Sequence, residues 1–259
     1  MAEETQYTAN TGIVTISAAN SNLDGGGTTY TLITGASNGT LVKSICIKAV
    51  GNTDAGMIRF YIGEKIFLEV PVPATRYSAN TPTFETQVTL DMTLKSGSTI
   101  VVSTEKANTF NIFAEGMDWA YYASSVRPDT TQTTANNGRA LVNTANSNLD
   151  GTGTLGTIYT CGTPATYKGS SIRSITIKSI VTVTSGMIRI FLQKASTKYL
   201  FTEVMVDTET LSSIDEAFER TILFDDDLDL QAGMSILAST QVANSFKIHA
   251  EGTDWNYVA

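Results

Sequence analysis

The feature that most constrains the fold is an internal repeat. Residues 114–119 read AEGMDW, and residues 250–255 read AEGTDW. The segment ANSNLDG occurs at 19–25 and again, unchanged, at 145–151. Because self-similarity at a fixed spacing marks repeated structural units, the 259-residue chain is expected to fold as two similar units in tandem.

Short runs of alternating apolar and polar residues lie between these motifs in both halves. Such alternation predicts β-strands with one buried face, as in GIVTIS at 12–17. About eight runs per half, with almost no helical periodicity, predict an all-β chain of two tandem β-sandwich domains. Eight short strands suit either a jelly-roll or an immunoglobulin-like topology. The paired runs are 28–34 with 155–161, 44–50 with 174–180, 56–61 with 186–191, 67–70 with 201–204, 88–94 with 224–230, and 109–114 with 245–250.

The repeat also sets the predicted domain boundaries. The first domain spans residues 1–123, and its residues 1–11 have few apolar side chains, which is typical of an arm or a loose first strand. Residues 124–137 are rich in Thr, Ser and Asn and include Pro128, a composition typical of an exposed linker. The second domain spans residues 138–259.

Charge and composition disfavour several classes of partner. The net charge is −8 and the sequence pI is about 4.7, whereas binding to nucleic acid or to an anionic membrane surface requires clustered Lys and Arg. The N-terminus is acidic and polar, unlike a secretory leader, and no run approaches the roughly 20 apolar residues of a transmembrane helix. We therefore expect no nucleic-acid or membrane partner, and a protein kept in the cytoplasm until it is exported or released by lysis.

The two cysteines, Cys46 and Cys161, lie one per repeat at non-equivalent positions, so neither domain can hold an internal disulfide. We expect both to be small buried thiols in a reducing compartment, the alternative being an inter-domain bridge or a reactive thiol.

Candidate catalytic groups are few. The only histidine, His249, aligns with Phe113 of the first repeat and is expected to be a half-buried or surface ring. Paired carboxylates can hydrolyse glycosides, and each repeat offers a pair, at 115 and 118 and at 251 and 254. A structural role is favoured, in which the Gly-x-Asp segment is a turn whose carboxylate binds backbone N–H groups and the following Trp covers the core.

Two acidic or amide-rich segments could bind a metal ion. Residues 20–25 and their copy resemble the start of a calcium-binding loop, D-x-[DN]-x-[DN]-G. Asn replaces the first Asp, however, and Thr31 and Thr157 stand where the final carboxylate is expected, so Asx-type turns are favoured. The acidic run at 225–229 has only Asp91 as its counterpart, and we interpret it as a solvated face or a negatively charged sheet edge.

Aromatic residues near the end of each repeat could form a platform for sugar binding, although core or edge-sealing roles are favoured for them. No residue is therefore assigned a catalytic, cofactor-binding or metal-binding role. The aromatic residues concerned are Trp119, Tyr121, Tyr122, Trp255 and Tyr257.

The order of the repeated elements is similar to that of β-sandwich proteins in tailed-phage virions, namely the auxiliary or decoration capsid proteins and head-fibre proteins of crAss-like phages. The similarity covers both repeats, and its markers are structural: the Asn-Ser-Asn-Leu-Asp-Gly loop, the Ser-Ile-x-Ile-Lys and Gly-Met-Ile-Arg strands, the Glu-Val strand, and the final Ala-Glu-Gly-x-Asp-Trp.

This resemblance implies a non-enzymatic virion protein, present in many copies and docked on the capsid shell. The implied partners are the major capsid protein and other virion proteins, and the implied location is the virion, assembled in the host cytoplasm. The alternative is a head fibre, or a receptor- or carbohydrate-binding module, on the virion surface.

Overall fold

The computed structural model describes residues 6–120, 130–212 and 217–258. These residues form two compact units, one built from strands β1–β8 and the other from β9–β16. Among the described residues, no helix is long and apolar enough to span a membrane. The strands of the first unit are β1 (Gln6–Ile16), β2 (Tyr30–Thr34), β3 (Thr40–Ala49), β4 (Gly56–Ile62), β5 (Lys65–Val72), β6 (Glu85–Leu94), β7 (Thr99–Thr104) and β8 (Phe110–Ala120). Those of the second unit are β9 (Thr130–Val142), β10 (Gly156–Thr160), β11 (Gly169–Ser179), β12 (Gly186–Lys194), β13 (Thr197–Val206), β14 (Glu219–Leu230), β15 (Ser235–Thr240) and β16 (Phe246–Val258).

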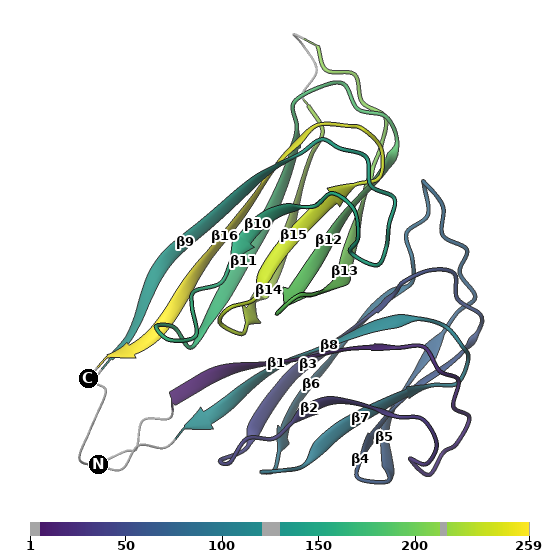
Figure 1. Ribbon diagram of the computed structural model, residues 1–259, viewed down its shortest axis with the longest axis vertical. Helices are drawn as coiled ribbons and strands as arrows, with labels where there is room; N and C mark the ends of the chain where they lie inside the picture. Colours follow the sequence, from purple (N-terminus) through teal and green to yellow (C-terminus); the bar gives the residue numbers. More distant parts are fainter. Residues whose placement is uncertain (1–5, 121–129, 213–216, 259) are drawn as a thin grey trace. The chain divides into compact units, whose positions relative to one another are not determined.

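Each unit is a sandwich of two antiparallel four-stranded sheets. In the first unit the strand orders are β1-β8-β3-β6 and β2-β7-β4-β5, and in the second they are β9-β16-β11-β14 and β10-β15-β12-β13 (Figure 1). The first and last strands of each unit are neighbours, and consecutive strands alternate between the sheets except at the β4–β5 and β12–β13 hairpins. This order is the jelly roll, which excludes the immunoglobulin-like alternative. The predicted all-β fold of two tandem sandwiches is confirmed.

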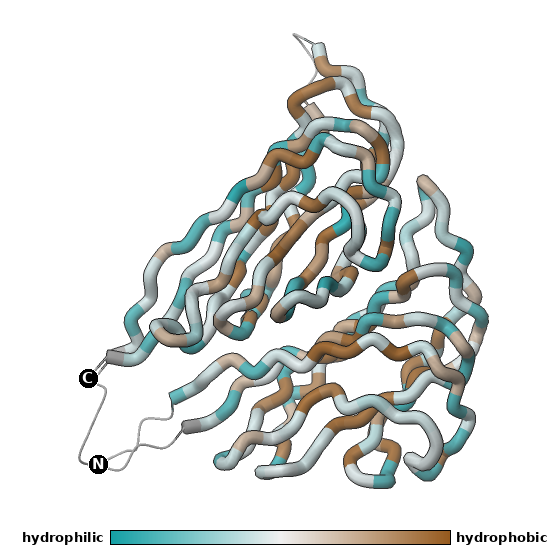
Figure 2. Tube along the Cα trace, in the orientation of Figure 1, coloured by the Kyte–Doolittle hydropathy of each residue, from teal (hydrophilic) through white to brown (hydrophobic). Residues whose placement is uncertain are grey.

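The inward-facing residues of the paired sheets form a separate core in each unit. In the first unit Ile16, Ile45, Phe60, Val102 and Ile112 are buried together. Such burial contributes about 1.5–3 kcal/mol per large apolar side chain. Apolar segments follow the strands of both units, while the loops are mostly hydrophilic (Figure 2). The alternation noted in the sequence is therefore the alternation between core and outer faces.

Irregularities of strand pairing recur at equivalent positions in the two units. The β3 register shifts between Val42 and Ser44, and the β11 register shifts between Ile172 and Ser174. Further shifts recur in the pairings of β2 with β7 and of β4 with β5, each matched in the second unit. Because bulges bend strands at defined places, the two units share their local distortions as well as their strand order.

Two glycines allow the sheets to approach closely at one corner of each sandwich. A Cβ at Gly138 in β9 would lie 1.8 Å from the carbonyl oxygen of Ile158, and one at Gly12 in β1 would lie 2.4 Å from that of Leu32. No side chain fits in such a gap, so glycine is required where the first strand of a unit crosses the second.

The predicted linker is wrong over residues 130–137, which form the first part of β9 and pair with β16. Residues 124–129 of that linker, and residues 1–5 of the N-terminal arm, lie outside the described part of the chain. Residues 6–11 belong to β1. Of the two expectations for the N-terminal segment, an arm or a first strand, these residues therefore follow the second. Thr-rich composition suits a linker, but Thr also has a high strand propensity, and only pairing with β16 distinguishes the two outcomes.

Candidate functional site

The aspartate of the repeated Ala-Glu-Gly-x-Asp-Trp motif lies inside a strand, not in a turn. In β8, Asp118 Oδ1 accepts a hydrogen bond from Asn10 Nδ2 at 2.9 Å and another from Thr40 Oγ1 at 2.5 Å. Asn10 Nδ2 also lies 3.3 Å from the carbonyl oxygen of Thr34 in the opposite sheet. The carboxylate therefore joins three neighbouring strands, and Asn10 extends the connection to the second sheet.

The second unit repeats this arrangement with one additional donor. Asp254 accepts from Asn136 Nδ2 at 2.9 Å, from Ser170 Oγ at 2.5 Å and from Tyr159 Oη at 3.3 Å. Asn136 Nδ2 also lies 3.0 Å from the carbonyl oxygen of Thr160. Burial, together with the Asp254 carboxylate, raises the pKa of Tyr159 above its usual range, so its hydroxyl remains a donor. We call these two arrangements the aspartate clamps.

The clamps correct the interpretation of the motif. The carboxylates bind side-chain amides and hydroxyls rather than backbone N–H groups, because the motif is strand and its N–H groups pair with neighbouring strands. Glu115 and Asp118 are three residues apart on one strand and point to opposite faces. Glu115 lies near Lys43 and Ser44, whereas Glu251 is exposed. The structure does not bring either carboxylate pair together.

Trp119 packs against the loop between β2 and β3, and the backbone of Trp255 bonds to the equivalent loop of the second unit. Gly39 has φ of +100°, and a Cβ there would lie 3.3 Å from the Trp119 ring, so glycine permits the close contact. Trp255 is 6% exposed, and its carbonyl accepts from the backbone N–H of Lys168. Of the proposed aromatic platform, Tyr121 and Tyr122 lie outside the described residues. The buried ring of Trp255 offers no face to a sugar, whereas Trp119 and Tyr257 are half-buried.

The repeated Asn-Ser-Asn-Leu-Asp-Gly segment is a loop held by its own side chains. Asn20 Nδ2 donates to the carbonyls of Gly26 and Thr28, both at 2.8 Å, and its Oδ1 accepts from the N–H of Asn22. Asp24 Oδ1 accepts from the N–H of Gly26 at 2.9 Å.

The copy forms the same bonds around Asn146, and Asp150 accepts from both the N–H and the hydroxyl of Thr152. These bonds lower the pKa of Asp150. The amide and carboxylate oxygens that a calcium ion would need thus serve Asx-type turns. Thr31 and Thr157 lie in strands β2 and β10.

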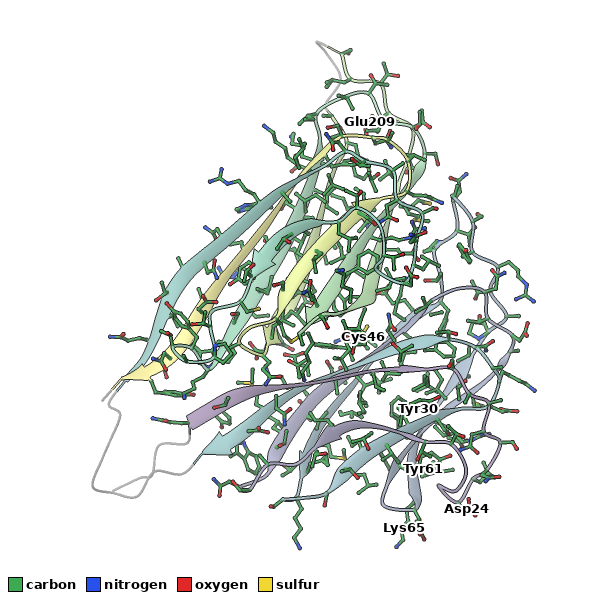
Figure 3. All side chains as sticks on the ribbon, viewed as in Figure 1. Asp24, Tyr30, Cys46, Tyr61, Lys65 and Glu209 are labelled. Carbon is green, nitrogen blue, oxygen red and sulfur yellow. The ribbon has the colours of Figure 1, made fainter. Side chains whose placement is uncertain are left out.

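This loop, which we call the strap, crosses the outer face of the second sheet in each unit. In the first unit the Asn20 N–H donates to the Thr104 carbonyl at 2.7 Å, and Tyr61 Oη donates to the Asn22 carbonyl at 2.9 Å. Figure 3 shows Tyr61 beside the loop that carries Asp24. In the second unit the Asn146 N–H donates to the Thr240 carbonyl at 2.8 Å. The strap thereby buries residues that alternation would otherwise leave on a solvent-facing surface.

An arginine–glutamate pair occurs at equivalent positions of the two units. Arg189 Nε is 3.0 Å from Glu203 Oε1, with both side chains 1% exposed, and Arg189 Nη1 donates to the Asn146 carbonyl at 3.3 Å. The counterpart pairs Arg59 Nε with Glu69 Oε1 at 2.9 Å, but Glu69 is 45% exposed. Both pairs are cross-strand neighbours within their hairpins, β4–β5 and β12–β13. Arg189 also ties its hairpin to the strap, whereas Arg59 Nη2 lies 3.5 Å from Glu105 Oε2.

The remaining candidates lie apart from the clamps and straps. His249 is exposed on β16, opposite Arg139 and Thr176. In the acidic run, Asp227 adopts φ of +50°, matching Asp91 at +48°, so this residue belongs to the shared design as a bulge position.

Asp229 is buried and accepts from Ser171 Oγ at 2.5 Å, contrary to the expected solvent-facing position. Cys46 and Cys161 are buried free thiols, as expected.

The sequence does not predict the roles of Asn10, in the expected arm or loose first strand, and Asn136, in the expected linker, nor the partners of the two arginines. The signal was present in the repeat itself. Asn-x-Gly recurs at 10–12 and 136–138, and the Arg and Glu of each pair recur in equivalent strands. Polar residues kept in both copies, at positions that do not form turns, indicated internal bonds.

Comparison with known proteins adds little to what this geometry indicates about the fold and the function. No protein-family model and no curated protein matches the chain. Among solved structures, the STIV MCP is 10% identical over 97% of this chain and 98% of its own, with a TM-score of 0.30. The major capsid protein P2 from bacteriophage PM2 is 12% identical over 98% of both chains, with a TM-score of 0.23.

The N-terminal CBM22-1-CBM22-2 tandem domain of Paenibacillus barcinonensis Xyn10C is 10% identical over 96% of this chain and 93% of its own, with a TM-score of 0.25. TM-scores of this size are too low to carry an argument about fold or function. Both therefore rest on the strand order and on the contacts described above.

Proposed function

We propose that this chain is a non-enzymatic structural protein of a tailed-phage virion, an auxiliary or decoration protein bound to the capsid shell. The observation that carries the proposal is the use of the shared polar residues. The clamps around Asp118 and Asp254 and the two straps bond to strands of their own unit. Duplication has therefore kept the groups that stabilise a jelly roll, a fold that builds viral capsid and lectin domains. The sequence resemblance to tailed-phage decoration and head-fibre proteins supports the same role.

The proposal assigns docking to loops and sheet edges, because a rigid double sheet presents its loops at both ends. One unit contacts the major capsid protein and the other remains exposed on the particle. The two units differ outside their shared braces, so they offer different surfaces for these two tasks.

Cryo-EM and mass spectrometry of the purified particle whose genome encodes this chain test the proposal. The expected result is paired jelly-roll density on the outside of the shell, with a copy number set by the symmetry of the lattice. A purified particle that lacks this chain overturns it.

The competing function is a receptor- or carbohydrate-binding module, because jelly rolls also form lectin domains. A glycan array probed with the purified chain and with Trp119→Ala and Trp255→Ala variants separates the two. Since Trp255 is buried, we expect its substitution to lower stability and to change no glycan signal. Glycan binding that is lost in a folded Trp255→Ala variant favours the competing function.

A further inference from the structure

The outer face of the sheet β9-β16-β11-β14 in the second unit carries a cluster of cations. These strands lie side by side in Figure 1. The register places Lys178, Lys247 and Leu141 in one row across the sheet, and Thr176, His249 and Arg139 in the next. Lys178, Lys247, His249 and Arg139 are all exposed. In a chain of net charge −8, this end of the face is locally basic, and we call it the basic end.

The basic end is unfavourable for the isolated unit. Lys178 stands directly opposite Lys247, and like charges at directly opposed positions destabilise a sheet. Glu219 compensates Lys178 at 2.5 Å. Within the described part of the chain, no ion pair forms to Lys247 or to Arg139. The two cations are thus available to an outside partner.

The opposite end of the same face is acidic. Glu251 follows His249 on β16 and is exposed. On β14 the pairing with β11 skips from Leu223 to Leu228, so residues 224–227 bulge out of the ladder. Asp225 and Asp226 in this bulge are exposed, while the third aspartate, Asp227, lies 3.9 Å from the exposed Arg173 of β11. We call Glu251 with the bulge the acidic end.

The first unit lacks this charge pattern. The equivalent rows contain Lys48, Asn111 and Thr15, then Cys46, Phe113 and Ile13. The equivalent bulge holds only residues 90–91, between Thr89 and Met92. The charged face is therefore specific to the second unit and is not required by the shared jelly roll.

We propose that this face of the second unit binds the same face of a second copy of the chain, forming a two-fold dimer. In an isologous interface each contact occurs twice, so one face must carry both complementary regions. A two-fold axis in the interface, perpendicular to the line joining the two ends, places each basic end over the partner copy's acidic end.

The same rotation brings together exposed apolar groups. Leu141 is 53% exposed beside the basic end, and Leu223 is 69% exposed next to the acidic bulge. Their counterparts in the first unit are Thr15 and Thr89. Charge complementarity orients and selects partners, and these two leucines supply apolar surface for the contact to bury.

Sedimentation velocity of the purified full chain tests the proposal. We expect a dimer at low ionic strength that weakens as salt is added, because the screening length falls from about 10 Å at 0.1 M to about 3 Å at 1 M. The basic-end variant, Arg139→Glu with Lys247→Glu, and the acidic-end variant, Asp225→Lys with Asp226→Lys, should each raise the dimer Kd at least about tenfold. An equimolar mixture of the two variants should form a heterodimer, since one face then carries additional acidic groups at its former basic end and the other carries additional basic groups at its former acidic end.

The matched control is Lys65→Glu with Lys95→Glu, which makes the same change of net charge at exposed positions of the first unit. This control should dimerise like the wild type, and circular dichroism verifies that every variant is folded. A wild-type chain that stays monomeric at low salt overturns the proposal. A basic-end variant that dimerises normally also overturns it, as does a mixture of folded variants that stays monomeric. A chain that stays monomeric and binds polyglutamate through Lys247 would show that the basic end serves an acidic partner and not a second copy. The purified chain is tested alone, so the outcome is independent of whether the virion contains it.

Discussion

Asp118 and Asp254 show how a carboxylate beside an aromatic ring serves as an internal brace. Each accepts hydrogen bonds from side chains on two neighbouring strands of its own unit. A carboxylate accepts several bonds at once and donates none, so it suits a site surrounded by donors. Removing it leaves those donors buried without an acceptor, which is more damaging than losing one ordinary bond.

We therefore expect Asp254→Ala to lower the free energy of unfolding by about 2–4 kcal/mol, since a buried unsatisfied donor costs roughly 1–3 kcal/mol. Urea denaturation monitored by tryptophan fluorescence measures this loss. Glu251→Ala, on the exposed side of the same strand, is the control and should stay within about 0.5 kcal/mol of the wild type. Equal stability of the two variants would mean that the clamp does not brace the sandwich.

Cys161 is expected to be chemically inert in the folded protein. Burial raises its pKa to about 12, so at pH 8 almost none of it is thiolate, and the thiolate is the reactive form. In a Cys46→Ala background, iodoacetamide at pH 8 should alkylate Cys161 at least about 100-fold more slowly in the folded chain than in urea. Intact-mass spectrometry follows the reaction, and folded-state labelling at the rate of a free thiol contradicts the expectation.

At the scale of elements, the straps explain why the same seven-residue loop persists in both repeats. A sheet face that alternation assigns to solvent is covered by the strap, which buries Tyr61 in one unit and Phe191 in the other. Tyr61 donates from its hydroxyl to the Asn22 carbonyl, whereas in the second unit Arg189 donates to the strap at a different position, the Asn146 carbonyl. The strap is kept while the side chain that fastens it varies.

The buried pair of Arg189 with Glu203 gives an element-scale prediction. Glu203→Ala leaves a guanidinium buried without its carboxylate, so we expect a loss of about 3–5 kcal/mol in unfolding free energy. The double variant Arg189→Met with Glu203→Met should be more stable than Glu203→Ala, because it removes both charges. Glu69→Ala, at the more exposed counterpart, should lose only about 0–1 kcal/mol. Thermal and urea unfolding test the order, and a double variant less stable than Glu203→Ala reverses it.

At the scale of the whole molecule, the chain is a duplicated jelly roll in which each copy contains its own core and braces. The repeated strand order, register shifts and clamps all lie within single units. A unit of this length buries roughly two-thirds of the surface that its unfolded chain exposes. Each copy therefore has the means to fold independently.

We accordingly expect a fragment spanning residues 129–259 to fold alone. It should show a β-sheet circular dichroism spectrum and one cooperative thermal transition. Asp254→Ala should destabilise the fragment and the full chain by the same amount, within about 0.5 kcal/mol. A fragment that is unfolded under conditions where the full chain is folded would show that the repeats depend on each other.

The sequence by itself determined the fold class, the duplication and the approximate strands. These follow from short-range signals: alternation with period two, turn residues between runs, and two copies that can be aligned. It also supported the Asx-type turns of the straps, because Asn20 and Asp24 bond to backbone within a few residues of themselves. Such local interactions need no knowledge of the tertiary fold.

Only the tertiary structure decided between jelly-roll and immunoglobulin-like topology, and it alone identified the roles of Asn10, Asn136, Arg189 and Asp254. The reason is separation along the chain. Asn136 meets Asp254 across 118 residues and Tyr159 meets it across 95, so their partnership depends on which strands are neighbours. The same holds for the charged face of the second unit, because cations from β9, β11 and β16 become a cluster only when those strands pair.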